Sequence, residues 1–341
     1  MQEKKIAILG TGGTIAGTSC LAGNNIGYRA AQIGVTHLLA AIPALADSAR
    51  FLVEQVAQID SKDMTFAVWV RLAQRVRHFL DRDDVCGVVI THGTDTLEET
   101  AYFLHAVLDP VKPVVLTCAM RPATALLPDG PQNLIDALAV AGHDGARGVV
   151  AVCAGAVHSA LDVQKVHTYR LDAFSSGDAG PLGYVEEGAL RVLRNWPGSK
   201  SRPNWLFNLS ETRLGAADLT AKLKEVLSCN NWPKVEIVMS YAGASGAVVD
   251  ALCLAGVDGL VVAATGNGTL HHDLEAALRK AKAQGVWVIR ATRCPNGRVL
   301  PKPDDAFADS QGLSPVKARV ELMLSLAELC VTQQGSLEGR C

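Results

Sequence analysis

The sequence predicts an α/β protein with two domains. We expect a larger N-terminal domain, built on a mostly parallel sheet with helices on both faces, and a smaller C-terminal α/β domain. Short apolar, β-branched runs alternate with helix-length amphipathic patterns, which is typical of a parallel sheet covered by its crossover helices. The length of 341 residues fits roughly two domains, and a hydrophobic content of 49% with 31 glycines fits a compact fold.

The individual elements can be placed along the chain. Strands are expected at 5–9, 51–58, 85–91, 113–117 and 148–153, and helices at 35–46, 63–81, 96–108 and 131–142, the second with Ser61 or Asp63 as its cap. Further on, strands are expected at 235–240, 259–263 and 286–290, and helices at 244–255, 271–284 and 315–331. Residues 176–233 are rich in Gly, Pro, Ser and Asn, with a short helix near 216–228. We therefore expect a domain at 1–195, a linker at 196–233 and a domain at 234–341.

Composition and charge exclude several classes of protein. The formal net charge is -2, so the chain offers no basic field for nucleic acid. Its apolar stretches are short and interrupted, which argues against a membrane span. The first residues lead into a predicted strand without an apolar leader, so we expect the protein in the cytoplasm.

The nine cysteines and nine histidines indicate neither a disulfide framework nor a metal site. The cysteines are scattered and form no Cys-x-x-Cys pair, so we expect them to be reduced and mostly buried. The histidines show no ligand spacing. His271 and His272 are adjacent, and adjacent side chains on a helix diverge, so we expect an exposed helix start there. We expect no metal and no organic cofactor.

Two threonine motifs carry the strongest functional signal. Thr11-Gly-Gly-Thr14 follows the apolar run at 5–9, and Thr91-His-Gly-Thr-Asp-Thr96 follows the run at 88–90. Each motif precedes a helical pattern, and strand-to-helix loops of this kind meet at the carboxyl ends of parallel strands. The hydroxyls of Thr14 and Thr94 could then face one ligand, with the Asp95 carboxylate beside them. This arrangement favours nucleophilic attack on a carbonyl over phosphate binding.

A dinucleotide site is a weaker interpretation of the first motif. Gly10 and Gly12 follow a strand, but position 15, where a third small residue is required, is Ile. The acidic residue expected about 20 positions later is also missing.

The two motifs together resemble the signatures of the bacterial-type L-asparaginases, in the asparaginase and glutaminase family. Further segments match in the order of the family: 59–64, 119–122, 129–133, 162–165 and 180–183. The resemblance is dense over about residues 5–185 and thinner from about 235 onward. It implies hydrolysis of L-asparagine to aspartate and ammonia through a threonine acyl-enzyme, in a homotetramer of close dimers with no cofactor.

The resemblance also implies roles for individual residues. Thr14 would be the nucleophile and Tyr28 its activator, while Thr94, Asp95 and Lys165 would form a second catalytic group. A threonine hydroxyl needs such activation because it is inert until a base takes its proton. The loop at 17–28, rich in Gly, Ser and Asn, would be a lid rather than an ordinary surface loop. The implied substrate-binding residues are Ser61, Lys62, Gly93 and Ala119.

Some positions depart from the family pattern. Position 62 is Lys where the family usually has Gln, Glu or Ser, so its ammonium would face either the substrate carboxylate or solvent. Many relatives also lend an Asn and a Glu from a neighbouring subunit. Here Gly243 stands at the Asn position and no Glu aligns well between 298 and 309, which affects expected affinity and glutamine discrimination more than the reaction.

Plainer interpretations remain for single residues. Thr91 and Thr96 could simply end a strand and cap a helix, Thr14 could be a helix cap, and Lys165 could be a surface charge. For the whole chain, the alternatives are an amidase that prefers glutamine or another primary amide, and a non-catalytic amino-acid-binding protein.

Overall fold

The computed structural model describes residues 4–21, 23–43, 45, 49–197 and 231–338. The chain forms two compact units, Met1–Ser201 and Arg202–Cys341. Most of the predicted linker at 196–233, with the helix expected near 216–228, lies outside the described residues. The predicted domain limits therefore stay a prediction.

The first unit is built on an eight-stranded sheet in the order β10-β9-β6-β5-β4-β3-β1-β2. Five parallel strands form its main part, at the positions that the sequence predicts. They are β1 (Lys5–Gly12), β2 (Phe51–Ile59), β3 (Val85–Thr91), β4 (Pro113–Thr117) and β5 (Gly148–Cys153). The predicted fold class, a mostly parallel sheet in the larger unit, is confirmed.

Three strands extend this sheet with antiparallel pairing: β6 (Ala156–Ser159), β9 (Gly183–Glu186) and β10 (Ala189–Val192). The sequence analysis did not predict them, and it treated the region from 176 onward as irregular. These strands have four residues each, and β10 is largely exposed, so they show no apolar run. A separate short hairpin pairs β7 (Gln164–Lys165) with β8 (Phe174–Ser175).

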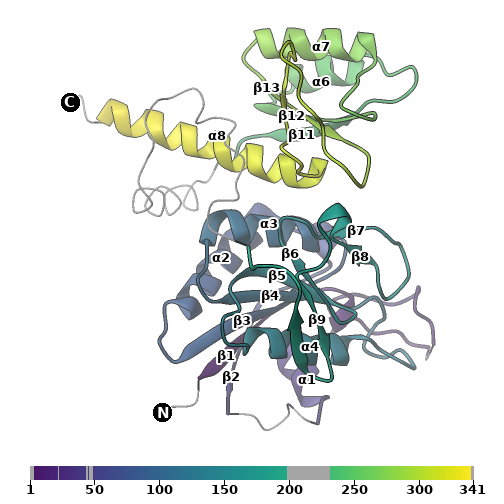
Figure 1. Ribbon diagram of the computed structural model, residues 1–341, viewed down its shortest axis with the longest axis vertical. Coiled ribbons are helices and arrows are strands. Elements are labelled where there is room, and N and C mark those ends of the chain that lie inside the picture. The colour runs from purple at the N-terminus through teal and green to yellow at the C-terminus, as the bar shows by residue number, and fades with distance from the viewer. Residues whose placement is uncertain (1–3, 22, 44, 46–48, 198–230, 339–341) are drawn as a thin grey trace. The chain divides into compact units, whose positions relative to one another are not determined.

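Helices cover both faces of the first sheet (Figure 1). On one face lie α2 (Phe66–Leu80) and α3 (Leu97–Leu108), and on the other α1 (Val35–Ala40) and α4 (Gly130–Ala141). The expected helix at 35–46 is shorter than predicted. The cap predicted for α2 is also wrong, because Thr65 caps it by accepting a bond from the Val68 N–H at 3.4 Å. Ser61–Asp63 forms a separate 3-10 turn, η2.

The core of the first unit makes the sheet a rigid base for the loops at its edge. Ile8, Val89, Val115 and Val150 come from neighbouring strands and pack with Leu134 of α4, all at most 1% exposed. Each such side chain contributes about 1.5–3 kcal/mol when it leaves water. The strand ends, and the first residues of the loops that follow them, are therefore held firmly in place.

The second unit contains a smaller, fully parallel sheet in the order β11-β12-β13-β14. Its strands are β11 (Val235–Met239), β12 (Gly259–Ala264), β13 (Trp287–Thr292) and β14 (Ala308–Asp309), and its helices are α6 (Ala247–Leu254), α7 (His272–Ala283) and α8 (Pro315–Glu338). The predicted α/β character is confirmed, although β14 was not predicted. Among the described residues, no helix is long and apolar enough to cross a membrane.

The cysteines differ in part from the prediction. The seven in the described residues are free thiols, as expected, but only Cys118 and Cys153 are buried and three are exposed. The expectation that most are buried is therefore wrong for this part of the chain. Scattered apolar neighbours in sequence do not ensure burial, because Cys20 and Cys294 lie in loops and Cys330 lies on an exposed position of α8.

Candidate active site

The two threonine motifs lie at the point where the order of the parallel strands reverses. In the order β5-β4-β3-β1-β2, the chain passes from β1 to β2 through α1 on one face and then returns past β1 to β3 through α2 on the other face, so the direction of the crossovers reverses at β1. Open α/β sheets bind ligands at the carboxyl ends of the strands around such a point, because the diverging loops leave a crevice there. Thr14 follows β1 directly, and Thr94 follows β3.

Two glycines allow these loops to touch. Gly13 has φ 79° and ψ -169°, a conformation essentially restricted to glycine. A Cβ added to Gly13 would lie 2.3 Å from the Cα of Gly93, and a Cβ on Gly93 would lie 2.5 Å from the Ser61 hydroxyl oxygen. The loops after β1 and β3 are thus in backbone contact, and the Ser61 side chain of the loop after β2 lies against Gly93. This brings together three of the predicted site segments.

Thr14 lies in a short 3-10 turn, η1 (Thr14–Ala16), and is only 7% exposed. Its Oγ1 is 2.6 Å from the Tyr28 phenolic oxygen, and either oxygen could be the donor. The loop that carries Tyr28 is closed by backbone bonds between Thr18 and Arg29. Thr14 makes no helix-capping bond, so the plainer interpretation does not explain its position. The role of this loop as a lid stays a prediction.

Thr94, Asp95 and Lys165 form a second hydrogen-bonded group. The Lys165 Nζ donates to Thr94 Oγ1 at 2.7 Å and to Asp95 Oδ1 at 2.6 Å. The backbone N–H of Lys165 donates to Glu98 on α3 at 3.2 Å, which fixes the β7 hairpin against that helix. The Lys165 side chain is 19% exposed, whereas that of Asp95 is 53% exposed. Lys165 is therefore no isolated surface charge, and the Asp95 carboxylate remains open to a ligand.

Ser61 joins the loop after β2 to the loop after β3. Its hydroxyl accepts the backbone N–H of Asp95 at 3.2 Å, and its carbonyl accepts the Thr96 hydroxyl at 2.8 Å. Thr96 is the N-cap residue of α3 by position, but its side chain makes no capping bond there. Because Ser61 is 2% exposed, its own position is fixed, and its hydrogen bond to the Asp95 N–H holds the Asp95 backbone in place.

Lys62 pairs with two acidic side chains and is largely exposed. Its ammonium is 2.7 Å from Asp60 Oδ2 and 3.4 Å from Asp63 Oδ2, and its side chain is 62% exposed. The Asp60 hydrogen bond is the main cause that raises the pKa of Lys62. Of the two orientations that the sequence left open, the ion pair at the surface fits the structure. A direct contact of the Lys62 ammonium with substrate stays a prediction.

Ala119 lies after β4 and packs with Ile15 and Ala16 beside Thr14. Its loop is held by Asp129, whose carboxylate accepts the backbone N–H groups of Met120 and Arg121, both at 2.9 Å. Asn133 supports the same loop from α4, because its amide nitrogen donates to the Cys118 carbonyl at 3.0 Å and to Asp129 at 3.2 Å. Sequence reasoning assigned no role to Asp129 or Asn133, although both belong to a matching segment.

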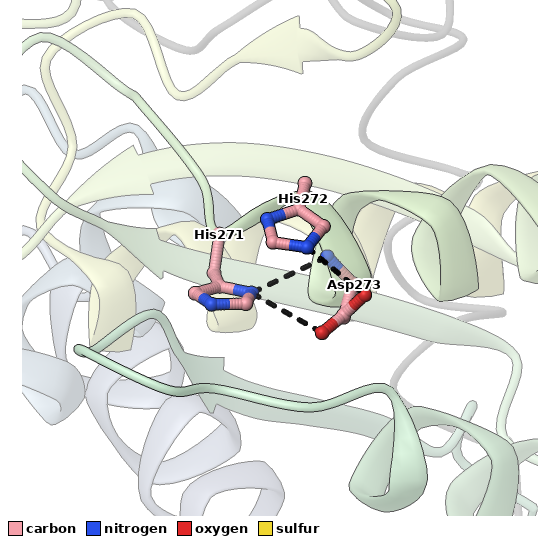
Figure 2. Close-up of side chains that lie close together, drawn as sticks. All are labelled: His271, His272 and Asp273. Carbon is pink, nitrogen blue, oxygen red and sulfur yellow. Dashed lines mark hydrogen bonds and ion pairs between the residues drawn. The ribbon is translucent and has the colours of Figure 1, made fainter.

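One group within the described residues has the composition of a metal site: His271, His272 and Asp273, whose potential ligand atoms lie within 4.8 Å of one another. Figure 2 shows the two imidazoles side by side. Their ring centroids are 4.4 Å apart. The expectation that these side chains diverge is wrong, because His271 is the extended N-cap residue and only His272 is helical. The expected exposed helix start is nevertheless present, since His272 is 85% exposed.

The local geometry fits helix capping better than metal binding. The His271 Nδ1 accepts the Asp273 N–H at 3.3 Å, so one ring nitrogen is already engaged (Figure 2). The partial positive charge of the α7 N-terminus also disfavours a cation there. Asp273 suits this position without a metal, because a carboxylate stabilises a helix N-terminus.

Comparison with known proteins agrees with this geometry. Residues 5–197 match the family model "Asparaginase, N-terminal", and residues 234–333 match "Glutaminase/Asparaginase C-terminal domain". The chain is 40% identical to L-asparaginase 2 of Escherichia coli K12, over 96% of this chain and 90% of that protein. It is 38% identical to a probable periplasmic L-asparaginase of Haemophilus influenzae, over 95% and 88% of the two chains.

A solved structure is similar over nearly the full length. The crystal structure of a probable cytoplasmic L-asparaginase from Campylobacter jejuni superposes with a TM-score of 0.83, at 38% identity and 95% coverage of each chain. The similarity therefore extends over both units of the chain.

Proposed function

Because the chain belongs to the asparaginase and glutaminase family, we propose that it hydrolyses the side-chain amide of L-asparagine to L-aspartate and ammonia. One observation carries the proposal beyond family membership. Two nearly buried threonine hydroxyls, each bonded to a polar side chain, follow the two central strands at the reversal point of the sheet. This is the arrangement that an amidase with a hydroxyl nucleophile requires.

In the proposed reaction, Thr14 Oγ1 attacks the amide carbon of asparagine. The Tyr28 oxygen, 2.6 Å away, takes the hydroxyl proton as it gives its own proton to the leaving nitrogen. An acyl-threonine and ammonia result. Water then attacks the acyl group, the Thr14 oxygen recovers a proton, and aspartate is released. Proton transfer of this kind contributes typically 10²–10⁴-fold to a rate.

Backbone donors would stabilise the negative charge that develops on the amide oxygen. Within the described residues, the Thr94 N–H donates to no protein acceptor, although its neighbour Asp95 N–H is bonded to Ser61. A fixed, unused N–H beside the nucleophile's loop fits this role. The second polar group holds the same segment, because Lys165 bonds both Thr94 and Asp95.

Charge matching would orient the amino-acid end of the substrate. The Asp95 carboxylate, 53% exposed, meets the α-ammonium group, and the Ser61 region and neighbouring backbone N–H groups meet the α-carboxylate. Gly93 leaves room for the ligand and Ala119 contacts its amide through the backbone. No metal or organic cofactor takes part in this proposal.

An ammonia assay with L-asparagine, L-glutamine and D-asparagine tests the function, with Thr14→Ala as the decisive variant. We expect ammonia release from L-asparagine by the wild type, none by Thr14→Ala, and retained asparagine binding by calorimetry. Loss of a nucleophile removes several kcal/mol of transition-state stabilisation, so turnover within about tenfold of wild type contradicts the assignment. Binding without ammonia release by the wild type favours the alternative of a non-catalytic amino-acid-binding protein.

Glutamine is the second candidate substrate. The family model that covers residues 234–333 names glutaminase beside asparaginase. Glutamine differs from asparagine by one methylene group, which changes binding in a pocket by only about 1–3 kcal/mol. The same assay gives the ratio of the two activities directly.

We also propose that the protein is cytoplasmic and assembles as a homotetramer of close dimers. The similar Campylobacter jejuni protein is titled a probable cytoplasmic L-asparaginase, and the family resemblance suggests the tetramer. The exposed apolar side chains of Leu126 and Leu127 near the Tyr28 loop are consistent with burial in an assembly. Light scattering tests the assembly, and cell fractionation, in which a periplasmic signal contradicts the proposal, tests the compartment.

A further inference from the structure

A buried hydrogen-bonded chain connects two helices to the loop that carries Thr94. His92 is the first residue after β3 and is 0% exposed. Its Nδ1 is 2.7 Å from the Gly93 carbonyl oxygen, and its Nε2 is 2.9 Å from the Thr100 hydroxyl on α3. The Trp69 indole N–H on α2 donates to that same hydroxyl at 2.8 Å. The chain therefore runs from α2 through α3 to the Gly93 peptide.

The chemistry of the groups fixes the direction of every bond. The Gly93 carbonyl can only accept, so the His92 Nδ1 carries the proton and donates. In a neutral imidazole the Nε2 is then an acceptor, so the Thr100 hydroxyl donates to it. The Trp69 indole N–H can only donate, and it fills an acceptor position of the same hydroxyl. Each of these three side chains therefore forms hydrogen bonds that match its donors and acceptors.

His92 stays neutral under ordinary conditions. Complete burial lowers its pKa to about 4, and the bond to Gly93 acts in the opposite direction with the smaller effect. A protonated ring would carry hydrogen on both nitrogens, which would remove the acceptor that the Thr100 hydroxyl uses. The hydrogen-bonded chain therefore keeps the same bond directions through the neutral pH range.

This arrangement sets the orientation of the Gly93–Thr94 peptide. In a trans peptide the N–H points opposite to the C=O. Because the Gly93 carbonyl faces the buried imidazole, the Thr94 N–H faces away from it and has no protein acceptor within the described residues. The residue that follows this peptide carries the hydroxyl bonded to Lys165.

We infer that Trp69, Thr100 and His92 are positioning residues for the reaction, because they hold the Gly93–Thr94 peptide with its N–H directed at the substrate. The inference rests on the proposed amidase function. None of the three side chains touches the reacting atoms in this scheme. Their effect is exerted on the oxyanion donor and on the starting position of the Thr94 hydroxyl.

A purely structural role for the chain makes a different prediction. Trp69 also stacks on Phe103, with ring centroids 4.9 Å apart, so α2 and α3 remain packed without the hydrogen bonds. If these hydrogen bonds only joined the helices to the sheet, losing them would lower stability and leave the turnover number of the folded enzyme unchanged.

Two substitutions of the same residue separate these roles. Thr100→Val keeps the shape and removes the hydroxyl, whereas Thr100→Ser keeps the hydroxyl. Val76→Ala, at a buried position on α2, serves as a control for lost stability away from the hydrogen-bonded chain. The measurements are the melting temperature, kcat and KM for L-asparagine, taken well below the melting temperature of each variant.

We expect Thr100→Val to lower kcat about tenfold with a smaller change in KM, since deleting an oxyanion donor outright costs about 10²–10³ and here the donor is only displaced. Thr100→Ser should recover most of kcat, and Val76→Ala should keep kcat within about threefold at a comparable melting temperature. Equal kcat values for Thr100→Val and Val76→Ala, or no recovery in Thr100→Ser, would overturn the inference.

A second measurement does not depend on turnover. Solid-state NMR of protein labelled with ¹⁵N-histidine, with His92→Gln for assignment, should show a neutral ring protonated at Nδ1 between pH 8 and 5.5. A ring protonated at Nε2, or at both nitrogens, would refute the proposed direction of the hydrogen bonds and with it the inference, whatever the activity. Absence of ammonia release by the wild type with the expected tautomer instead refutes the proposed function and leaves the hydrogen-bonded chain established.

Discussion

Replacing Gly13 with alanine tests whether the loops after β1 and β3 must touch for catalysis. Gly13 combines a backbone conformation essentially restricted to glycine with a close approach, since an added Cβ lies 2.3 Å from the Gly93 Cα and 2.4 Å from its N. Gly180 provides a matched control. Its φ of 68° and ψ of 170° fall in the same region, but nothing lies within 4 Å of an added Cβ.

The two sites therefore share backbone strain and differ in steric contact. A non-glycine residue in this region costs about 1–3 kcal/mol of stability, which applies to both variants. At Gly13 the loops must also separate by about 1 Å to restore ordinary contact distance, and a misplacement of that size can cost about 10²-fold in rate. We therefore expect kcat to fall about a hundredfold in Gly13→Ala and to stay within about threefold in Gly180→Ala.

The assay measures kcat for L-asparagine by ammonia release, together with urea unfolding of each variant. Both variants should lose a similar amount of stability from strain, with an additional loss for Gly13→Ala from the displaced loop. If Gly13→Ala kept kcat within about threefold of wild type, the loops would not need to touch and the geometric argument would be wrong. An equal loss of kcat in Gly180→Ala would show that strain alone explains the effect.

Four further predictions follow from the same geometry. Asp95→Asn should raise KM and lower kcat together, because in the proposed function the carboxylate that bonds Lys165 at 2.6 Å also meets the substrate ammonium; a change in melting temperature alone would contradict this. Lys62→Gln should change KM and kcat by no more than about tenfold, since its ammonium pairs with Asp60 at the surface; a hundredfold fall in kcat would place it in the catalytic group. Burial holds the pKa of His92 near 4, against about 6.5 in the unfolded chain, so the free energy of unfolding should fall as the pH drops below about 6.5. At pH 5 the loss should be about 2 kcal/mol greater than in His92→Gln. If urea unfolding gave both proteins the same pH dependence of the free energy of unfolding, this prediction would be refuted. Exhaustive chelation or added reductant should leave activity unchanged, and inactivation reversed by zinc would contradict a metal-free reaction.

The sequence predicted the main part of the fold because its signals are local. Four of the five parallel strands, β1, β3, β4 and β5, are buried apolar runs, which are conspicuous in a chain of mixed composition, whereas in β2 only Val56 is buried. The strands β9 and β10 lack that signal, since they lie at the sheet edge and are partly solvated. Helix ends were less predictable, because Thr65 rather than Ser61 or Asp63 caps α2.

Spacing along the chain predicts which side chains are neighbours only within one continuous helix or strand. The divergence expected for His271 and His272 assumed two helical residues, but the helix begins between them, so the rings stack. The orientation of Lys62 was equally beyond reach. It depends on Asp60, which lies two residues earlier and becomes a partner only because Ser61–Asp63 folds into a tight turn.

The candidate site combines two kinds of support, and this explains which residues the sequence alone could find. Thr14 and Thr94 follow central strands directly, are 7% and 6% exposed, and owe their positions to the packed sheet, so the strand-end motif was enough to identify them. Tyr28 and Lys165 come from a closed loop and a two-residue strand, 14 and 71 residues along the chain from the hydroxyls they bond. No local pattern links a hydroxyl to such a partner, which is why only the family resemblance indicated them. In the proposed reaction the same division suits catalysis, because a nucleophile must be held to within about 0.5 Å by a rigid support, whereas activating groups on loops can shift as substrate enters and product leaves.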